Sequence, residues 1–438
     1  MLSTNKKPLP FLAQKFAAVC VFAFIYTNCA FAFSSPEKKI SKEQPAAVPA
    51  AQAPAAAKAA PKAAASAISA AEIVANMKFG WNLGNTLDAF AGGDPANGWN
   101  GANKSLGINT ETYWGMPKTT QAMIKGIKAS GISTIRIPVS WHDHIDANYK
   151  IDPEWMSRVK TVVDWAMDEG LYVIINIHHD NVAANTLKNN SRKGFCPASK
   201  CKDESEKYIT KIWQQVAEVF NSGYDEHLIF ELMNEPRLPG DPHEWNWEAS
   251  CKTCNDAMEC LNEYNQLCVD TIRATGGNNA KRMLMIPSYV AAPGAAISPK
   301  FKMPEDPANC LALSVHMYTP YDFAMKDKGG DKTFTQKHKS DLDYWFRELN
   351  TKFVQKGYPV VIGEMGATNK ENLAEREKWF TYFCTKAKSC NMSAILWDNG
   401  IWEVPKSKSY NELYGFYNRE KQTWYFPSLI EAATSAMN

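Results

Sequence analysis

Eight short apolar runs, separated by segments with helical periodicity, constrain the fold of this chain most strongly. Runs of this length between turn residues are typical of buried strands, and their alternation with helices predicts a parallel sheet. Eight such units over about 365 residues favour an α/β fold, a (β/α)8 TIM barrel, over a doubly wound open sheet. The expected strands are Met77–Leu83, Ser133–Val139, Leu171–Ile177, Leu228–Met233, Arg282–Pro287, Leu311–Val315, Pro359–Ile362 and Ala394–Leu396.

Two of the helical segments between these runs carry clear end signals. Asp152 is a suitable N-cap, Pro153 suits the first helical position, and Gly170 can end the helix. A second helix is expected from about Thr120 to Ser130 and is stopped by Gly131.

Two glutamates come at the ends of apolar runs. Glu235 follows Leu228–Met233 and precedes Pro236, which breaks regular structure, and Glu364 directly follows the run from Pro359. The carboxyl ends of parallel strands are where α/β folds collect their chemistry. The pair therefore predicts an acid and a nucleophile that act on one bond.

Other polar or aromatic residues also mark strand ends, and each has a structural interpretation as well. Arg136 could be a solvated charge, His178 a satisfied core histidine and Trp397 plain core. Asn234 and Glu235 can face one cleft only if the backbone bulges or turns there. Taken together, the strand-end residues predict one site at one end of the barrel: Asn82, Asn85, Arg136, His178, His179, Asn234, Glu235, His316, Tyr318, Glu364 and Trp397.

The N-terminal part of the chain has the composition of an export signal followed by a tether. Residues 1–32 combine lysines, a short apolar stretch and an Ala-Phe-Ala cleavage pattern, which predicts a signal peptide rather than a membrane span. Lipidation at Cys29 is the weaker alternative. Residues 33–68 are rich in Pro and Ala and predict a linker, with the cell envelope as its one candidate partner. The barrel would then occupy residues 69–438, secreted or in the periplasm or at the cell surface.

Charge and cysteine usage limit the classes of partner and site. The formal net charge is +2, which argues against a nucleic-acid partner, and we expect a monomer. Cys20 and Cys29 lie in the signal, which leaves nine of the 11 cysteines in the mature chain. The close pairs Cys196/Cys201 and Cys384/Cys390 suit disulfides in an exported protein. A zinc site is the less favoured interpretation of a further group, Cys251, Cys254, Cys260 and Cys268.

Seven stretches, in order and each on its expected strand, resemble glycoside hydrolase family 5, the cellulase-like retaining glycosidases. The resemblance covers about Ala70 to Asn438, and its detail is similar to subfamily 4, which acts on β-1,4- and mixed-linkage glucans, including xyloglucan. The stretches are Gly80–Asn85, Ile135–Pro138, Asn176–Asp180, Leu232–Arg237, Val315–Tyr321, Ile362–Glu364 and Trp397–Asn399.

The resemblance implies a role for each matching residue. Glu235 would be the general acid/base and Glu364 the nucleophile, with Arg136 and Tyr318 keeping Glu364 ionised and oriented. Asn234 would contact the sugar 2-hydroxyl. His178 and His316 would frame the reactive subsite, with His316 near the acid/base. Trp397 would stack under the sugar, and a cis peptide often follows this tryptophan in the family. The resemblance implies no metal and no cofactor.

A retaining mechanism sets two further expectations. The two carboxyl groups must lie about 5–5.5 Å apart. Glu235 must hold a proton, so we expect its pKa to be raised by burial and by Glu364. Further aromatic platforms could be Trp81, Trp141, Trp245, Trp247 and Trp402, although each could equally be core.

The sequence is compatible with three rival interpretations. The polymer could be mannan or xylan in place of a β-glucan. The chain could be a zinc hydrolase with His178, His179 and Asp180 as ligands, although adjacent histidines on a strand would point apart. It could also be a non-catalytic glucan-binding protein, which would not need both glutamates and their supporting residues.

Overall fold

The computed structural model contains a closed barrel of eight parallel strands, joined in sequence order from β1 to β8 and back to β1. It describes residues 68–91, 106–189, 192–326, 328–403 and 412–438. The predicted (β/α)8 fold is confirmed. The barrel strands are β1 Phe79–Asn82, β2 Thr134–Ile137, β3 Tyr172–Asn176, β4 Leu228–Glu231, β5 Leu284–Pro287, β6 Leu311–His316, β7 Val360–Met365 and β8 Ser393–Leu396.

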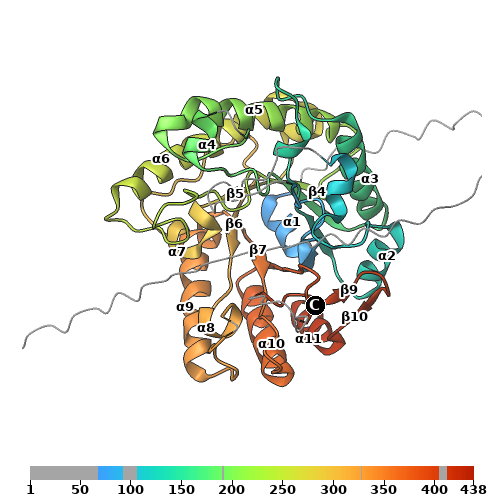
Figure 1. The fold of residues 1–438 in the computed structure, drawn as a ribbon. Coiled ribbons are helices and arrows are strands. Elements are labelled where there is room, and N and C mark those ends of the chain that lie inside the picture. The colour runs from blue at the N-terminus through green and yellow to red at the C-terminus, as the bar shows by residue number, and fades with distance from the viewer. Residues whose placement is uncertain (1–67, 92–105, 190–191, 327, 404–411) are drawn as a thin grey trace, which may run out of the picture. The chain divides into compact units, whose positions relative to one another are not determined.

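Helices surround the barrel, and the short helix α1 lies across its centre in the view of Figure 1. The α-helices are α1 Ala70–Met77, α2 Gln121–Ala129, α3 Pro153–Asp168, α4 Ala184–Lys188, α5 Lys202–Val219, α6 Lys252–Ala274, α7 Pro293–Ala296, α8 Tyr321–Ala324, α9 Gln336–Lys352, α10 Leu373–Ser389 and α11 Pro427–Met437. Short 3-10 helices span Gly107–Thr112, His142–His144, Ser199–Cys201, Gly277–Ala280, Tyr289–Ala291 and Val354–Lys356. A small hairpin joins β9 Tyr417–Asn418 to β10 Thr423–Trp424.

The predicted end signals act as expected in α2 and α3. Asp152 accepts a hydrogen bond from the backbone of Glu154, and Pro153 begins α3. Gly131 and Gly170 follow the two helices with φ of +83° and +65°, a region that favours glycine. Several strand boundaries differ by one to three residues from the prediction, and the difference that affects the site is that β7 continues through Glu364 to Met365. Glu364 is therefore part of its strand, next to an irregularity in the pairing with β8.

The barrel interior is built in layers, because alternate residues of each strand point inward. At the end covered by α1 the inward residues are apolar and pack against α1 residues such as Ile73 and Met77. The next layer toward the carboxyl ends contains buried polar and charged residues, including Arg136 and Glu231. The site residues are thus carried by a layer of the core itself as well as by the loops above it.

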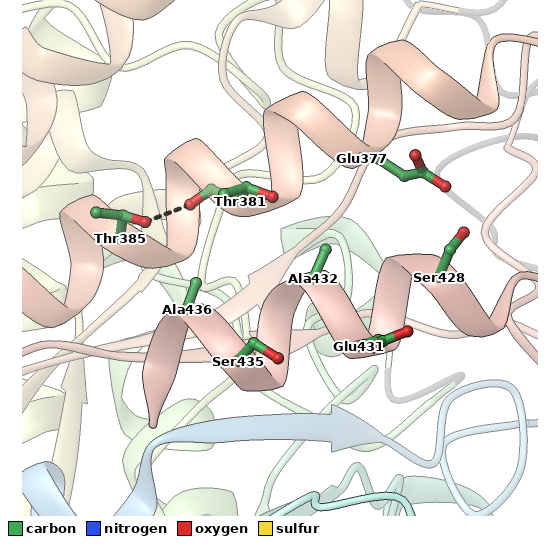
Figure 2. Close-up of a pocket in the computed structure, with 8 residues that line it drawn as sticks. All are labelled: Glu377, Thr381, Thr385, Ser428, Glu431, Ala432, Ser435 and Ala436. Carbon is green, nitrogen blue, oxygen red and sulfur yellow. Dashed lines mark hydrogen bonds between the residues drawn. The ribbon is translucent and has the colours of Figure 1, made fainter.

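A groove of about 520 Å³ lies between α10 and α11, away from every predicted site residue (Figure 2). Small and polar side chains from both helices face it. Its lining residues are Glu377, Thr381, Thr385, Ser428, Glu431, Ala432, Ser435 and Ala436.

The cysteine pairing differs from the prediction. The structure has a disulfide between Cys251 and Cys254, whereas Cys196, Cys201, Cys384 and Cys390 are free. The Cys201 thiol donates to the backbone oxygens of Cys196 and Ala198 instead. Cys260 and Cys268 are buried free thiols, so the four-cysteine zinc site is also not formed.

The predicted signal peptide and almost all of the predicted linker lie outside the described residues. Within the described part of the chain, no helix combines the length and apolarity needed to cross a membrane.

Candidate active site

Arg136 is at the centre of the predicted site and is fully buried. Its guanidinium donates to the Asn82 side-chain oxygen at 2.9 Å, to the Asn234 side-chain oxygen at 2.6 Å and to Glu364 Oε1 at 2.9 Å. Burial lowers the pKa of Arg136, but the charges of Glu231 and Glu364 outweigh burial and leave this pKa above its ordinary value. Arg136 therefore carries a permanent positive charge beneath the site.

Glu231 is a site residue that the sequence analysis missed. Its carboxylate is fully buried and lies 2.7 Å from the Arg136 guanidinium. Asn176 and Ser314 also donate to it, at 2.8 Å and 2.6 Å. The signal was present, since Glu231 is a charged residue inside an apolar run. Glu231 comes two positions after Ile229, which points into the barrel, so period-two alternation turns Glu231 inward as well.

Glu364 is held at both carboxylate oxygens. Arg136 donates to Oε1 at 2.9 Å, and the Tyr318 hydroxyl donates to Oε2 at 2.9 Å. The Asn82 amide donates to the backbone oxygen of Gly363 and thereby fixes the neighbouring backbone. Burial raises the pKa of the Glu364 carboxyl above its ordinary value, although His316 and Arg136 act to lower it.

Glu235 lies beyond the end of β4, where the chain has left the strand, so it and Asn234 can both face the site. Glu235 Oε1 and His316 Nδ1 are 2.8 Å apart. Burial raises the pKa of the Glu235 carboxyl, but the hydrogen bond and the charge of His316 outweigh burial. The pKa of Glu235 is lowered, and the prediction of a raised pKa is wrong in this structure. The reason is the hydrogen bond and the charge of His316, which the family resemblance places near the acid/base but whose effect on the pKa of Glu235 it does not reveal.

The two predicted carboxylates lie close together. One oxygen of Glu235, one oxygen of Glu364 and a ring nitrogen of His316 are all within 4.8 Å of one another. In glycosidases that retain anomeric configuration the two carboxyl groups are about 5–5.5 Å apart, whereas inverting enzymes need about 6.5–9.5 Å. The spacing found here fits the first class.

His178 faces the site as a neutral ring. The Asn176 amide lies 3.1 Å from its Nδ1, and burial holds the pKa of His178 well below its ordinary value. The rings of His178 and Trp397 are nearly parallel, with centroids 5.9 Å apart. Trp397 is 9% exposed, and its ring packs against Gly84. A Cβ at position 84 would lie 2.8 Å from this ring, which leaves no room for a side chain there. The peptide bond after Trp397 is not cis; within the described residues a cis bond occurs at Thr319–Pro320.

The predicted zinc ligands are only partly brought together. His178 and His179 lie beyond the end of β3, and their ring centroids are 4.4 Å apart, so the expectation that they point apart is wrong. Asp180 is turned away from them and accepts hydrogen bonds from the backbone of Trp141 and from the Tyr208 hydroxyl. The expected set of His178, His179 and Asp180 is therefore not formed.

The five predicted aromatic platforms separate into two groups. Trp81 and Trp141 are buried, and Trp247 packs against the core and donates to the Cys254 oxygen. Trp245 is 50% exposed beneath the Arg237 guanidinium, and Trp402 is 37% exposed and stacks on Tyr425. Only the exposed pair can offer a ring face to a polymer.

Comparison with known proteins agrees with this geometry. The chain matches the family model of the cellulases, glycosyl hydrolase family 5, over residues 92–402. It is 39% identical to endoglucanase A of Clostridium longisporum, over 83% of this chain and 65% of that protein, just under two thirds of its length. It is 37% identical to endoglucanase B of Ruminococcus albus, over 83% of this chain and 80% of that protein.

Solved structures are equally similar. One is a broad-specificity endoglucanase of family 5, subfamily 4, from Ruminococcus champanellensis with bound cellotriose, at a TM-score of 0.74 and 40% identity, over 84% of this chain and 99% of that one. Another is a family 5 lichenase of Caldicellulosiruptor sp. F32 in complex with cellotetraose, at a TM-score of 0.77 and 38% identity, over 87% and 98%.

Proposed function

The chain belongs to glycosyl hydrolase family 5, the cellulase family, and from this premise we propose that it is an endo-acting, retaining enzyme that cleaves internal β-1,4 bonds of β-glucans. Cellulose, mixed-linkage glucan and xyloglucan are the proposed polymers. The observation that carries the proposal is the pair of carboxylates within 4.8 Å: Glu364 is buried and held by Arg136 and Tyr318, and Glu235 is partly exposed. The names of the relatives as endoglucanases and a lichenase support the substrate class.

In the first step Glu364 attacks the anomeric carbon. Its carboxylate is oriented by Arg136 at Oε1 and by Tyr318 at Oε2, and their donation stabilises the ionised form. A bond forms between the Glu364 oxygen and the sugar, and the bond to the leaving glycosidic oxygen breaks while Glu235 gives that oxygen a proton. In the second step Glu235 takes a proton from water, and the water oxygen displaces Glu364.

The proton for the leaving group is held by the pair of Glu235 and His316 together. In this structure the contact with a protonated His316 favours the Glu235 carboxylate, and the nearby carboxylates raise the pKa of His316 although burial acts to lower it. Coupled groups such as these share protons as a unit. One proton on the pair is sufficient, because His316 Nδ1 lies directly against Glu235 Oε1.

The remaining residues position the sugar. Asn234 would contact the 2-hydroxyl, with its oxygen held by Arg136. His178 and Trp397 offer parallel rings at the reactive subsite, which suits the flat apolar face of a pyranose. His179, which is partly exposed beside His178, would line the same subsite.

Export belongs to the same proposal. Residues 1–32 are proposed as a signal peptide, 33–68 as a linker and 69–438 as the catalytic barrel, which acts as a monomer outside the cytoplasm. A cell cannot take up an insoluble polymer, so cleavage outside the cell suits the proposed substrate.

The test is reducing-sugar release from carboxymethylcellulose, mixed-linkage β-glucan, xyloglucan, mannan and xylan. Wild type is compared with Glu364→Gln and with Glu263→Gln, a control at an exposed carboxylate on α6. We expect wild type and control to cut the β-glucans, and Glu364→Gln to lose activity by about 10,000-fold. If only mannan or xylan is cleaved, that polymer replaces β-glucan as the proposed substrate. No cleavage, or full activity of Glu364→Gln, would overturn the mechanism.

A further inference from the structure

Arg237 follows Glu235 by two residues and takes no part in either chemical step. Its guanidinium nevertheless contacts the acid/base and two neighbouring side chains at once. Nη1 donates to the backbone oxygen of Glu235 at 3.0 Å, Nε donates to Glu244 Oε1 at 3.0 Å, and the guanidinium carbon lies 4.2 Å from the centre of the Trp245 ring. The guanidinium is therefore fixed on three sides.

The ion pair with Glu244 sets the direction of this guanidinium. Glu244 is itself held, because its Oε2 accepts from the backbone nitrogen of Gly240 at 2.8 Å. The side chains of Arg237 and Glu244 are both mostly shielded from water. Since the donors of an arginine lie in fixed directions in one plane, Nε on Glu244 leaves Nη1 aimed at Glu235.

The backbone at Glu235 has few other supports. Glu235 lies beyond the end of β4, and within the described residues its backbone oxygen accepts one hydrogen bond, the one from Arg237. The next two residues are held from other segments. The Pro236 oxygen accepts from the Val290 backbone at 2.9 Å, and the Arg237 backbone donates to the Asn181 side chain at 2.6 Å. Contacts of this loop, and not the sheet, thus fix the main chain that carries the acid/base.

Arg237 also acts on Glu235 through its charge. Burial raises the pKa of the Glu235 carboxyl, the hydrogen bond and the charge of His316 lower it, and the charge of Arg237 lowers it further. Loss of the Arg237 charge should therefore raise the pKa of Glu235, so that its proton leaves at higher pH.

We propose that Arg237 is a positioning residue for the proton donor: by holding the backbone oxygen of Glu235, it aims the Glu235 carboxyl at the leaving glycosidic oxygen. The inference rests on the proposed function and deepens it, because it gives the acid/base an anchor of its own. A misplacement of about 1 Å can cost roughly 100-fold in rate, so an anchor that acts through the backbone is sufficient to affect the first step.

The test compares a leaving group that needs a proton with one that does not. Phenyl β-cellotrioside requires protonation by Glu235, whereas the anion released from 2,4-dinitrophenyl β-cellotrioside is stable without it. Arg237→Met keeps an apolar side chain over Trp245 but has neither charge nor donor. We expect its kcat/KM, which reports the first step, to fall about 30-fold on the phenyl glycoside and to stay within about twofold on the dinitrophenyl glycoside.

Arg237→Lys separates position from charge. Lysine keeps the positive charge but lacks the planar fork that reaches Glu244 and Glu235 together. We expect a loss of about 10-fold on the phenyl glycoside alone, with the fall of kcat/KM at high pH at its wild-type position. In Arg237→Met this fall should move to higher pH, because the charge that favours loss of the proton is gone.

Arg158 offers a matched control, because it makes the same three kinds of contact without touching Glu235. It donates to both oxygens of Glu111 and to the backbone oxygen of Thr119, and its guanidinium carbon lies 5.3 Å from the centre of the Trp165 ring. Arg158→Met should change the rates on the two glycosides in the same proportion and leave their pH dependence as in wild type.

Cleavage of the dinitrophenyl glycoside shows that a variant is folded, and Arg237→Lys decides alone if Arg237→Met cleaves neither substrate. An equal loss on both glycosides, or no loss on the phenyl glycoside, would overturn the inference while the proposed active site stands. The same selective loss in Arg158→Met would also overturn it, since the effect would then belong to the fold in general. If wild type cleaves neither glycoside, the proposed function itself fails.

Discussion

Two neighbouring layers of the same barrel interior differ completely in chemistry. The layer next to α1 is apolar and contains Ile174, Ile229, Met285, Ala312, Val361 and Ile395. The layer above it, toward the carboxyl ends of the strands, is polar and contains Asn82, Arg136, Asn176, Glu231 and Ser314. Both layers are buried to the same degree. The apolar layer is stable when its side chains are closely packed. In the polar layer, every charged group and hydrogen-bond donor also needs a partner.

Strand β4 contributes a residue to each of the two layers and so serves both stability and reaction. On β4, Ile229 packs under α1 and Glu231, two residues later, binds Arg136. Because Glu231 neutralises part of the Arg136 charge, Arg136 can stay buried and still present Nη1 to Glu364. The charged layer is thus a rigid support that orients the groups that meet the substrate.

The largest expected effect comes from removing a charge in the polar layer. Glu231→Ala leaves Arg136 buried without its main counter-charge, and we expect it to lower the free energy of unfolding by about 3–5 kcal/mol. Ile229→Val, two residues away in the apolar layer, should cost about 0.5–1.5 kcal/mol. Urea unfolding of both variants measures the difference. Equal costs would show that burial alone, and not pairing, sets the stability of this strand.

His144 is a buried polar residue whose ring nitrogens, within the described residues, lack hydrogen-bond partners. Its ring stacks on Trp155 at 3.7 Å. Burial lowers the pKa of His144 to about 4, below the ordinary 6.5 of the unfolded chain. The unfolded state therefore gains the proton first as the pH falls, and stability present above pH 6.5 is lost between 6.5 and 4.

His144→Phe should remove this dependence, because phenylalanine keeps the stacked ring without a titrating group. In wild type we expect His144 to account for about 2 kcal/mol of lost unfolding free energy at pH 5 relative to pH 7.5. Unfolding of both proteins at the two pH values measures the loss. A parallel decline of wild type and variant would assign the acid sensitivity to other groups.

The smallest expected effect concerns Glu235 and His316, which lie above the polar layer. The raised pKa of His316 predicts that kcat/KM of wild type falls as the pH rises through an apparent pKa above 6.5, where the shared proton leaves the pair. In His316→Gln the Glu235 carboxyl alone must hold the proton, so this limb should move to lower pH and activity at pH 7 should fall by about 10-fold. A pH–rate profile of each protein on one soluble β-glucan checks this. An unchanged basic limb would remove His316 from the proton path.

Much of the site could be predicted because its residues stand at strand ends. Glu364, Arg136 and Tyr318 were predicted from their positions after apolar runs and from the family resemblance, and the structure brings them together. Asn176, Glu231 and Ser314 were missed, because they act through their contacts with Arg136 and with one another. The disulfide prediction was wrong since sequence spacing says nothing about which way two thiols point, as Cys201 illustrates.

The sequence by itself determined the barrel, since apolar period and helix end signals act locally and leave few other ways to bury eight strands. It also determined which residue types stand at the strand ends. Only the tertiary structure decided their protonation, because the pKa of Glu235 depends on a histidine 81 positions away in the chain. It also decided that a layer of the core is charged, because Arg136 on β2 and Glu231 on β4 become partners only when both strands pair with β3.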